Sequence, residues 1–160
     1  MSNQPEAATA QRQNGSHNGS APNGSAPQGT QHSEEQGPRK LNNVLADLAK
    51  PIPQRHLRTK KKGGAQISFS PWYRVSKIMD HYTRGFWDGQ VTNVSTTEDR
   101  IIVTYSITIH GKEGSLTRQA TGTELLEVSY GDPSSNAEAQ AFKRACARFG
   151  LGLHLYEKED

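Results

Sequence analysis

Residues 101–109, "IIVTYSITI", alternate between two kinds of side chain. Thr104, Ser106 and Thr108 carry hydroxyl groups, and the odd-numbered positions around them are apolar or aromatic. A period of two residues places one set on each face of a β-strand. The stretch therefore predicts a strand whose buried face is formed by Ile101, Val103, Tyr105, Ile107 and Ile109.

Two strand-like segments flank this strand. "FWDGQVTNVS" (86–95) precedes it with an irregular pattern, and "SLTRQATGT" (115–123) follows it with a weaker one. The polar segments "TTEDR" and "HGKEG" supply the turns between them. This order is typical of an antiparallel β-meander with one face packed on a core.

The last segment, "NAEAQAFKRACARFG" (136–150), has the pattern of a helix. Ser135 and Glu138 have the spacing of a capping box, so the helix is predicted to start at Ser135. Gly150 can end it. The stripe predicted to face the core comprises Phe142, Ala145, Cys146 and Phe149. The opposite arc carries three cations, Lys143, Arg144 and Arg148.

Two helices are predicted ahead of the strands. Residues 41–48 repeat leucine and valine at i, i+3, i+4 and i+7, which gives one apolar face. In "SPWYRVSKIMDHYTRG" (70–85), Ser70 can cap a helix, Pro71 suits its first position and Gly85 can end it. One face of this helix is predicted to hold Val75, Ile78, Met79 and Tyr82, and another Arg74, Lys77 and His81.

"QRHLRTKKKGGAQ" (54–66), between these helices, is predicted to be a basic loop. The element order is then α, α, β, β, β, α. This order indicates an α+β fold, in which a three-stranded antiparallel meander packs against a C-terminal helix and two helices precede it.

Residues 1–38 differ in composition from the rest of the chain. They repeat "NGS" and contain no Val, Ile, Leu, Phe, Trp or Tyr. Such a segment cannot bury enough apolar surface to offset the entropy of ordering it, so a disordered tail is predicted. One folded domain is predicted at 39–160. The tail has a net charge of −2 and the whole chain +3, which leaves +5 on the domain.

Two long segments of the domain lack acidic residues. One lies between Asp47 and Asp80, and the other between Glu138 and Glu157. Clustered cations favour a polyanionic partner, although a basic surface that is merely solvated is the alternative. The second segment contains the cations of the last helix, and the first contains Lys50, Arg55, Arg58, Lys60, Lys61, Lys62, Arg74 and Lys77.

Aromatic residues lie close to some of these cations. Nucleic-acid sites for single strands combine a cationic groove with aromatic rings on which bases stack. Trp72, Tyr73, Phe86 and Trp87 lie near Arg74 and Arg84 in the sequence, although a core position is the favoured interpretation for each ring taken alone.

Motifs of several enzyme classes are absent from the sequence. There is no G-x-x-x-x-G-K-[ST] loop for nucleotide phosphates, no G-x-S-x-G elbow and no histidine spacing typical of metal ligands. Cys146 is the single cysteine, which excludes an internal disulfide and favours a core position. We expect a binding protein without a cofactor. It is also predicted to be cytoplasmic and not membrane-bound, because no signal peptide or membrane span is recognisable.

The sequence "AEAQAFKRACARFGLGLHLY", together with "YRVSKIMDHYTRGFW" and the meander, resembles the DNA-binding core of the Rad-fifty-two annealing family. "LNNVLADLAKPIP" adds a likeness to the leader of its bacterial branch, called DdrA. The resemblance covers about 41–157. It implies a β-β-β-α core, oligomeric rings or arcs, and annealing of complementary DNA strands without nucleotide hydrolysis.

The resemblance also implies roles for particular residues in binding single-stranded DNA. Lys143 and Arg144 fall on the family's basic pair in the helix that lines the groove, and Arg74 falls on its arginine before the sheet. Arg148 lies one position from a further family cation, and Arg84 is a loose match to a base-stacking residue. A second contact strip is implied for Arg100, Lys112 and Arg118.

Partners follow from the same resemblance. Single-stranded DNA and further copies of the chain are expected, and a recombinase or a single-strand-binding protein is a candidate. We expect no recombinase-recruiting region after this core, of the kind that some eukaryotic members carry.

Two other classes of function fit the sequence. Double-stranded RNA-binding domains also combine a basic last helix with a three-stranded sheet, although they are shorter and their last helix usually begins with lysines. The third class is an assembly protein that does not bind nucleic acid and whose cations only keep its surface solvated.

Overall fold

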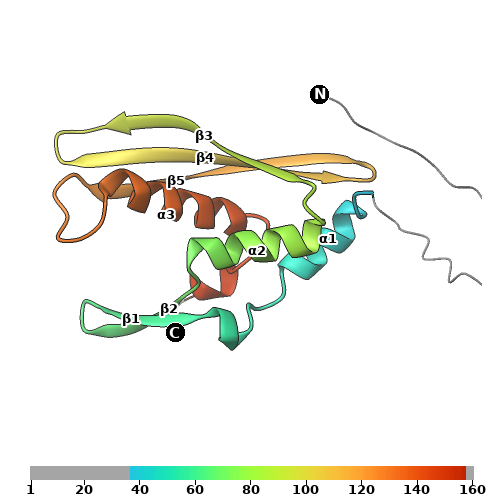
Figure 1. Ribbon diagram of the computed structural model, residues 1–160, viewed down its shortest axis with the longest axis horizontal. Helices are drawn as coiled ribbons and strands as arrows, with labels where there is room; N and C mark the ends of the chain where they lie inside the picture. The colour runs from blue at the N-terminus through green and yellow to red at the C-terminus, as the bar shows by residue number, and fades with distance from the viewer. Residues whose placement is uncertain (1–36, 158–160) are drawn as a thin grey trace, which may run out of the picture. The chain divides into compact units, whose positions relative to one another are not determined.

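The computed structural model describes residues 37–157 (Figure 1). Residues 1–36, nearly all of the predicted tail, lie outside the described residues, so the disorder of that tail stays a prediction. Within 37–157, no helix is both long and apolar enough to cross a membrane.

The predicted meander is confirmed. Strands β3 (Trp87–Thr96), β4 (Arg100–Gly111) and β5 (Gly114–Leu125) form one antiparallel sheet in the order β3-β4-β5. The predicted inward face of β4 is correct, because Ile107 and Ile109 are completely buried there. Strand β3 is long and continuous, and its irregular pattern corresponds to one bulge between Val91 and Asn93.

Helix α3 (Pro133–Ala147) lies against this buried face (Figure 1). It approaches β5 so closely at Gly122 that a Cβ atom there would overlap the carbonyl oxygen of Ala137 and lie 2.5 Å from the amide nitrogen of Ala141. The apolar stripe predicted for this helix is buried as expected. Burial raises the pKa of the Cys146 thiol, which agrees with its predicted place in the core.

The predicted start of α3 was wrong. Asp132 is the N-cap, and its carboxylate accepts the backbone N–H of Ser134 at 3.1 Å. The hydroxyl of Ser135 donates to the same carboxylate, so it does not form a capping box with Glu138. Pro133 occupies the first helical turn, where its fixed φ is favourable, and the N-cap lies three residues earlier than predicted.

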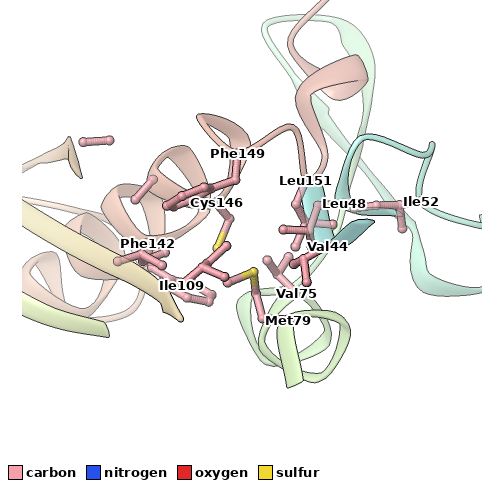
Figure 2. Packing of buried hydrophobic residues seen from close by; sticks show 13 residues of the cluster. Val44, Leu48, Ile52, Val75, Met79, Ile109, Phe142, Cys146, Phe149 and Leu151 are labelled. Carbon is pink, nitrogen blue, oxygen red and sulfur yellow. The ribbon is translucent and has the colours of Figure 1, made fainter. Parts of the chain in front are cut away.

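Helices α1 (Leu41–Leu48) and α2 (Trp72–Thr83) complete the main core. Figure 2 shows Val44 and Leu48 of α1 beside Val75 and Met79 of α2, with Cys146 of α3 facing the same space. Ser70 does not cap α2, contrary to prediction. Its hydroxyl is buried and donates to the carbonyl of His56 at 3.2 Å.

The predicted basic loop is a β-hairpin, which is a further correction. Strands β1 (Arg58–Lys62) and β2 (Ala65–Phe69) pair antiparallel and follow a short 3₁₀ helix, η1 (Gln54–His56). Gly63 and Gly64 form the turn, both with positive φ, as the tight turns of two-residue hairpins require. Figure 1 shows this hairpin on the side of the helices away from the large sheet, close to a second 3₁₀ helix, η2 (Leu153–Leu155).

Candidate nucleic-acid interface

A first basic hollow of about 370 Å³ lies between the β1-β2 hairpin and α3. Lys60 and Lys62 line it from β1, Phe69 from β2 and Lys143 from α3. The ammonium nitrogen of Lys60 lies 5.0 Å from the centre of the Phe69 ring, and that of Lys143 lies 5.7 Å from it. Both distances allow cation–π attraction, so the ring holds two positive charges at one site.

Lys143 carries its charge in an unfavourable environment. Partial burial lowers the pKa of its ammonium group, and the positive charge of Lys60 lowers it further. An anion that entered the hollow would offset both effects, because it would face the two ammonium groups together. The electrostatics of the hollow therefore favour the binding of a phosphate group.

A second basic hollow, of about 650 Å³, lies between α3 and β5. The guanidinium carbon of Arg118 lies 5.2 Å from the centre of the Phe149 ring, and this side chain donates to the backbone carbonyl of Arg148. Arg118 is thereby held in place. Arg144 and the side chain of Arg148 project into the same hollow, and both residues are exposed.

Tyr156 lines both hollows. It follows η2, and 53% of its surface is exposed. Burial of its hydroxyl raises the pKa of Tyr156, while the charge of Arg144 lowers it. We call the two hollows, joined at Tyr156, the basic track. Its members are Lys60, Lys62, Phe69, Arg118, Lys143, Arg144, Arg148 and Tyr156.

Arg74 and Lys77 lie away from the basic track. Lys77 lines a separate hollow of about 290 Å³ with Lys50, Arg55 and His81. Arg74 lies beside this group, and its guanidinium donates to the carbonyl of Arg55 at 3.1 Å. The cations predicted on α2 thus form a second basic region rather than an extension of the first.

The other predicted residues are dispersed. Lys61 points to the opposite face of β1 from Lys60 and Lys62, as strand alternation requires. Arg84 ends α2 in the left-handed conformation and donates to the carbonyl of Gly37 at 3.4 Å.

The structure does not gather Arg100, Lys112 and Arg118 into one strip. Arg100 begins β4, and Lys112 follows the last residue of that strand. Arg118 pairs with the buried Ile107 and so faces α3, whereas Arg100 has the opposite parity and faces away from that helix.

Two contributors to the track, Phe69 and Tyr156, were not predicted from the sequence. The aromatic residues that were predicted lie elsewhere: Trp72 and Trp87 line a cleft on another side of α3. Within residues 37–157, no group of three or more His, Cys, Asp or Glu side chains is placed to hold a metal ion.

The β-β-β-α core and the basic track define a candidate polyanion-binding protein. No protein-family model matches the chain. It is similar to the mitochondrial DNA repair RAD52-like protein 1 of Arabidopsis thaliana, with 40% identity over 124 residues, 76% of this chain and 70% of the relative. The chloroplastic DNA repair RAD52-like protein 2 of the same plant is 38% identical over 125 residues, 75% of this chain and 62% of that relative, less than two thirds of its length.

The chain belongs to the RAD52-like family. This confirms the resemblance to the Rad-fifty-two type. Membership of the bacterial DdrA-like branch stays a prediction.

Proposed function

We propose that this protein acts in DNA repair and recombination, where it binds single-stranded DNA along the basic track and anneals complementary strands. The names of both relatives describe DNA repair proteins. The observation that carries the proposal is the position of Tyr156, which joins two cationic hollows into one path across α3.

The chemistry of the track suits a single strand. Lysine and arginine side chains hold phosphates and carry most of the affinity, whereas exposed rings stack with bases of any sequence. Tyr156 offers such a ring between the two groups of cations. A duplex would offer its phosphates but not the faces of its bases, so the tyrosine would gain nothing from it.

Annealing needs a long strand held extended, and one track is short. Repeated copies would lengthen it by symmetry. Strands β3 and β5 are the outer strands of the sheet, and such edges can pair with another chain. We therefore propose a ring or arc of copies that works without nucleotide hydrolysis, a cofactor or a catalytic centre.

The test measures binding and annealing together. Fluorescence anisotropy should show that single-stranded DNA binds more tightly than duplex DNA or duplex RNA of equal length, with an affinity that falls as salt rises. Complementary oligonucleotides should pair faster in the presence of the protein, with neither ATP nor magnesium added. A preference for duplex RNA, or an unchanged pairing rate, would contradict the proposal.

Two further expectations stay predictions. A recombinase or a single-strand-binding protein is the proposed protein partner. A cytoplasmic location is proposed from the sequence, whereas the two relatives are named as a mitochondrial and a chloroplastic protein.

A further inference from the structure

A cleft of about 320 Å³ opens on α3 away from the basic track, and four of the eight residues that line it are aromatic. Trp72 comes from α2, Trp87 from β3, Tyr105 from β4 and Phe142 from α3. The Phe142 ring centre lies 6.1 Å from that of Trp87 and 5.4 Å from that of Tyr105, so these three rings are in contact. Trp72 is 54% exposed, which leaves this side of the cleft open.

One carboxylate, Glu138, lies in this aromatic wall. It is exposed, and within residues 37–157 it has neither a hydrogen bond nor an ion pair. By contrast, the nearby Asp80 accepts a hydrogen bond from the indole nitrogen of Trp87 at 2.7 Å. The pKa of Tyr105 is raised first by burial and then by the negative charge of Glu138. The charge of Glu138 therefore acts on groups inside the cleft.

Rings together with an unpaired carboxylate form a site for a cation. The faces of tryptophan and tyrosine rings attract ammonium and guanidinium groups, and a carboxylate beside them adds an ion pair. The same carboxylate repels phosphate groups, so this cleft is poorly suited to a nucleic-acid backbone. Its volume would fit one long side chain and not a helix.

Two features point to a second copy of the chain as the source of that cation. Residues 37–157 contain seventeen Lys and Arg against eleven Asp and Glu, so another copy presents mainly cations and would be repelled unless some of them met a carboxylate. The cleft also adjoins the outer edge of the sheet. Trp87 is the first residue of β3, whose remaining residues are all exposed.

We propose that the cleft lined by Trp72, Trp87 and Glu138 receives an arginine or lysine side chain from the neighbouring copy in the assembly. This inference rests on the assembly that is part of the proposed function. It assigns Trp72 of α2 and Trp87 of β3 to contact between copies instead of base stacking.

The test uses a property of the sequence: Trp72 and Trp87 are the two tryptophans of the chain, so tryptophan emission reports on this cleft alone. As the full-length protein is concentrated without DNA, its emission should shift to shorter wavelength in step with the rise in mass seen by light scattering.

Glu138→Gln should weaken assembly by about tenfold, because it removes the ion pair but keeps the side chain's size. Glu127→Gln, an exposed carboxylate in the β5–α3 loop, is the matched control and should assemble as the wild type does.

The outcomes separate this inference from the proposed function. A wild-type protein that stays monomeric would overturn both the assembly and this inference, while leaving DNA binding to be judged by anisotropy. Assembly without a change in emission, or with equal strength in Glu138→Gln, would overturn this inference alone. Emission that changes on adding single-stranded oligonucleotide to already assembled protein would assign the cleft to a base and overturn it as well.

Discussion

Lys60 and Lys143 hold their ammonium groups over one ring, that of Phe69, at 5.0 Å and 5.7 Å from its centre. The two residues come from β1 and α3, which are 83 positions apart in the sequence at this point. Like charges at one site repel, so the arrangement is favourable chiefly when an anion is present. This relationship makes the first hollow sensitive to pH.

The first prediction concerns the pH dependence of DNA binding. The pKa of Lys143 in the free protein is lowered from 10.5, and a bound phosphate would raise it again. As the pH rises through this lowered pKa, the ammonium group of Lys143 loses its proton in the free protein. DNA binding then requires Lys143 to bind a proton again, so the affinity for DNA falls. We expect wild-type affinity for single-stranded DNA to begin falling at a lower pH than that of Lys143→Arg, whose guanidinium stays charged.

Fluorescence anisotropy across the alkaline range at fixed ionic strength would measure this difference. Lys61→Arg is the control, because Lys61 lies on the other face of β1, and its curve should match that of the wild type. Identical curves for wild type and Lys143→Arg would show that Lys143 does not meet the DNA.

The second prediction concerns the salt dependence. Lys143→Ala combined with Arg144→Ala removes one cation from each hollow. For single strands the slope of log affinity against log salt changes by about 0.7 per phosphate contact, so the double variant should lose about 1.4. The control double variant, Lys61→Ala with Arg100→Ala, also removes two positive charges, but from positions outside the basic track. Its slope of log affinity against log salt should stay that of the wild type. Equal losses in both double variants would indicate a diffuse charge effect without a defined path.

The third prediction concerns the contact between the sheet and α3. Gly122→Ala places a methyl group against the backbone of Ala137 and Ala141, which cannot move as a flexible side chain would. Overpacking of this kind costs about 1–3 kcal/mol of unfolding free energy. Urea denaturation should show this loss, whereas Gly37→Ala, where a methyl group meets nothing within 4 Å, should have little effect. A neutral Gly122→Ala would show that the helix shifts easily on the sheet.

The sheet and α3 were predictable because burial leaves a periodic pattern in their sequences. Strand β4 alternates since one face meets α3, and α3 repeats its apolar residues since one side meets the sheet. The hairpin left no such pattern. Every residue of β1, "RTKKK", is exposed, so no apolar face marks it as a strand, and the two glycines were its main signal.

The basic track was predictable in part. The cations of α3 were identified, but they were expected on one face. Lys143 and Arg144 are adjacent and therefore differ by about 100° around the helix, which sends them into different hollows. Tyr156 could not be placed, because it lies beyond the helix. Gly150 and Gly152, with φ of 103° and 73°, redirect the chain after α3, and local sequence does not specify where such a turn leads.

The last prediction tests Tyr156 as a stacking platform between the two hollows. Stacking of one base on an aromatic ring contributes about 1–3 kcal/mol, so Tyr156→Ala should weaken binding of single-stranded DNA by about tenfold or more. The change removes no charge, and the salt slope should therefore stay that of the wild type, unlike that of the cation variants.

Tyr156→Phe keeps the ring and should bind nearly as the wild type does, which would also exclude a role of the hydroxyl group in binding. About half of the residue's surface, 53%, is exposed, and Tyr156 is not among the buried core residues, so a thermal melt should show both variants folded. A lower salt slope in Tyr156→Ala would mean that the ring positions Arg144 or Lys143 and does not contact a base, and an unchanged affinity would mean that the strand does not cross from one hollow to the other.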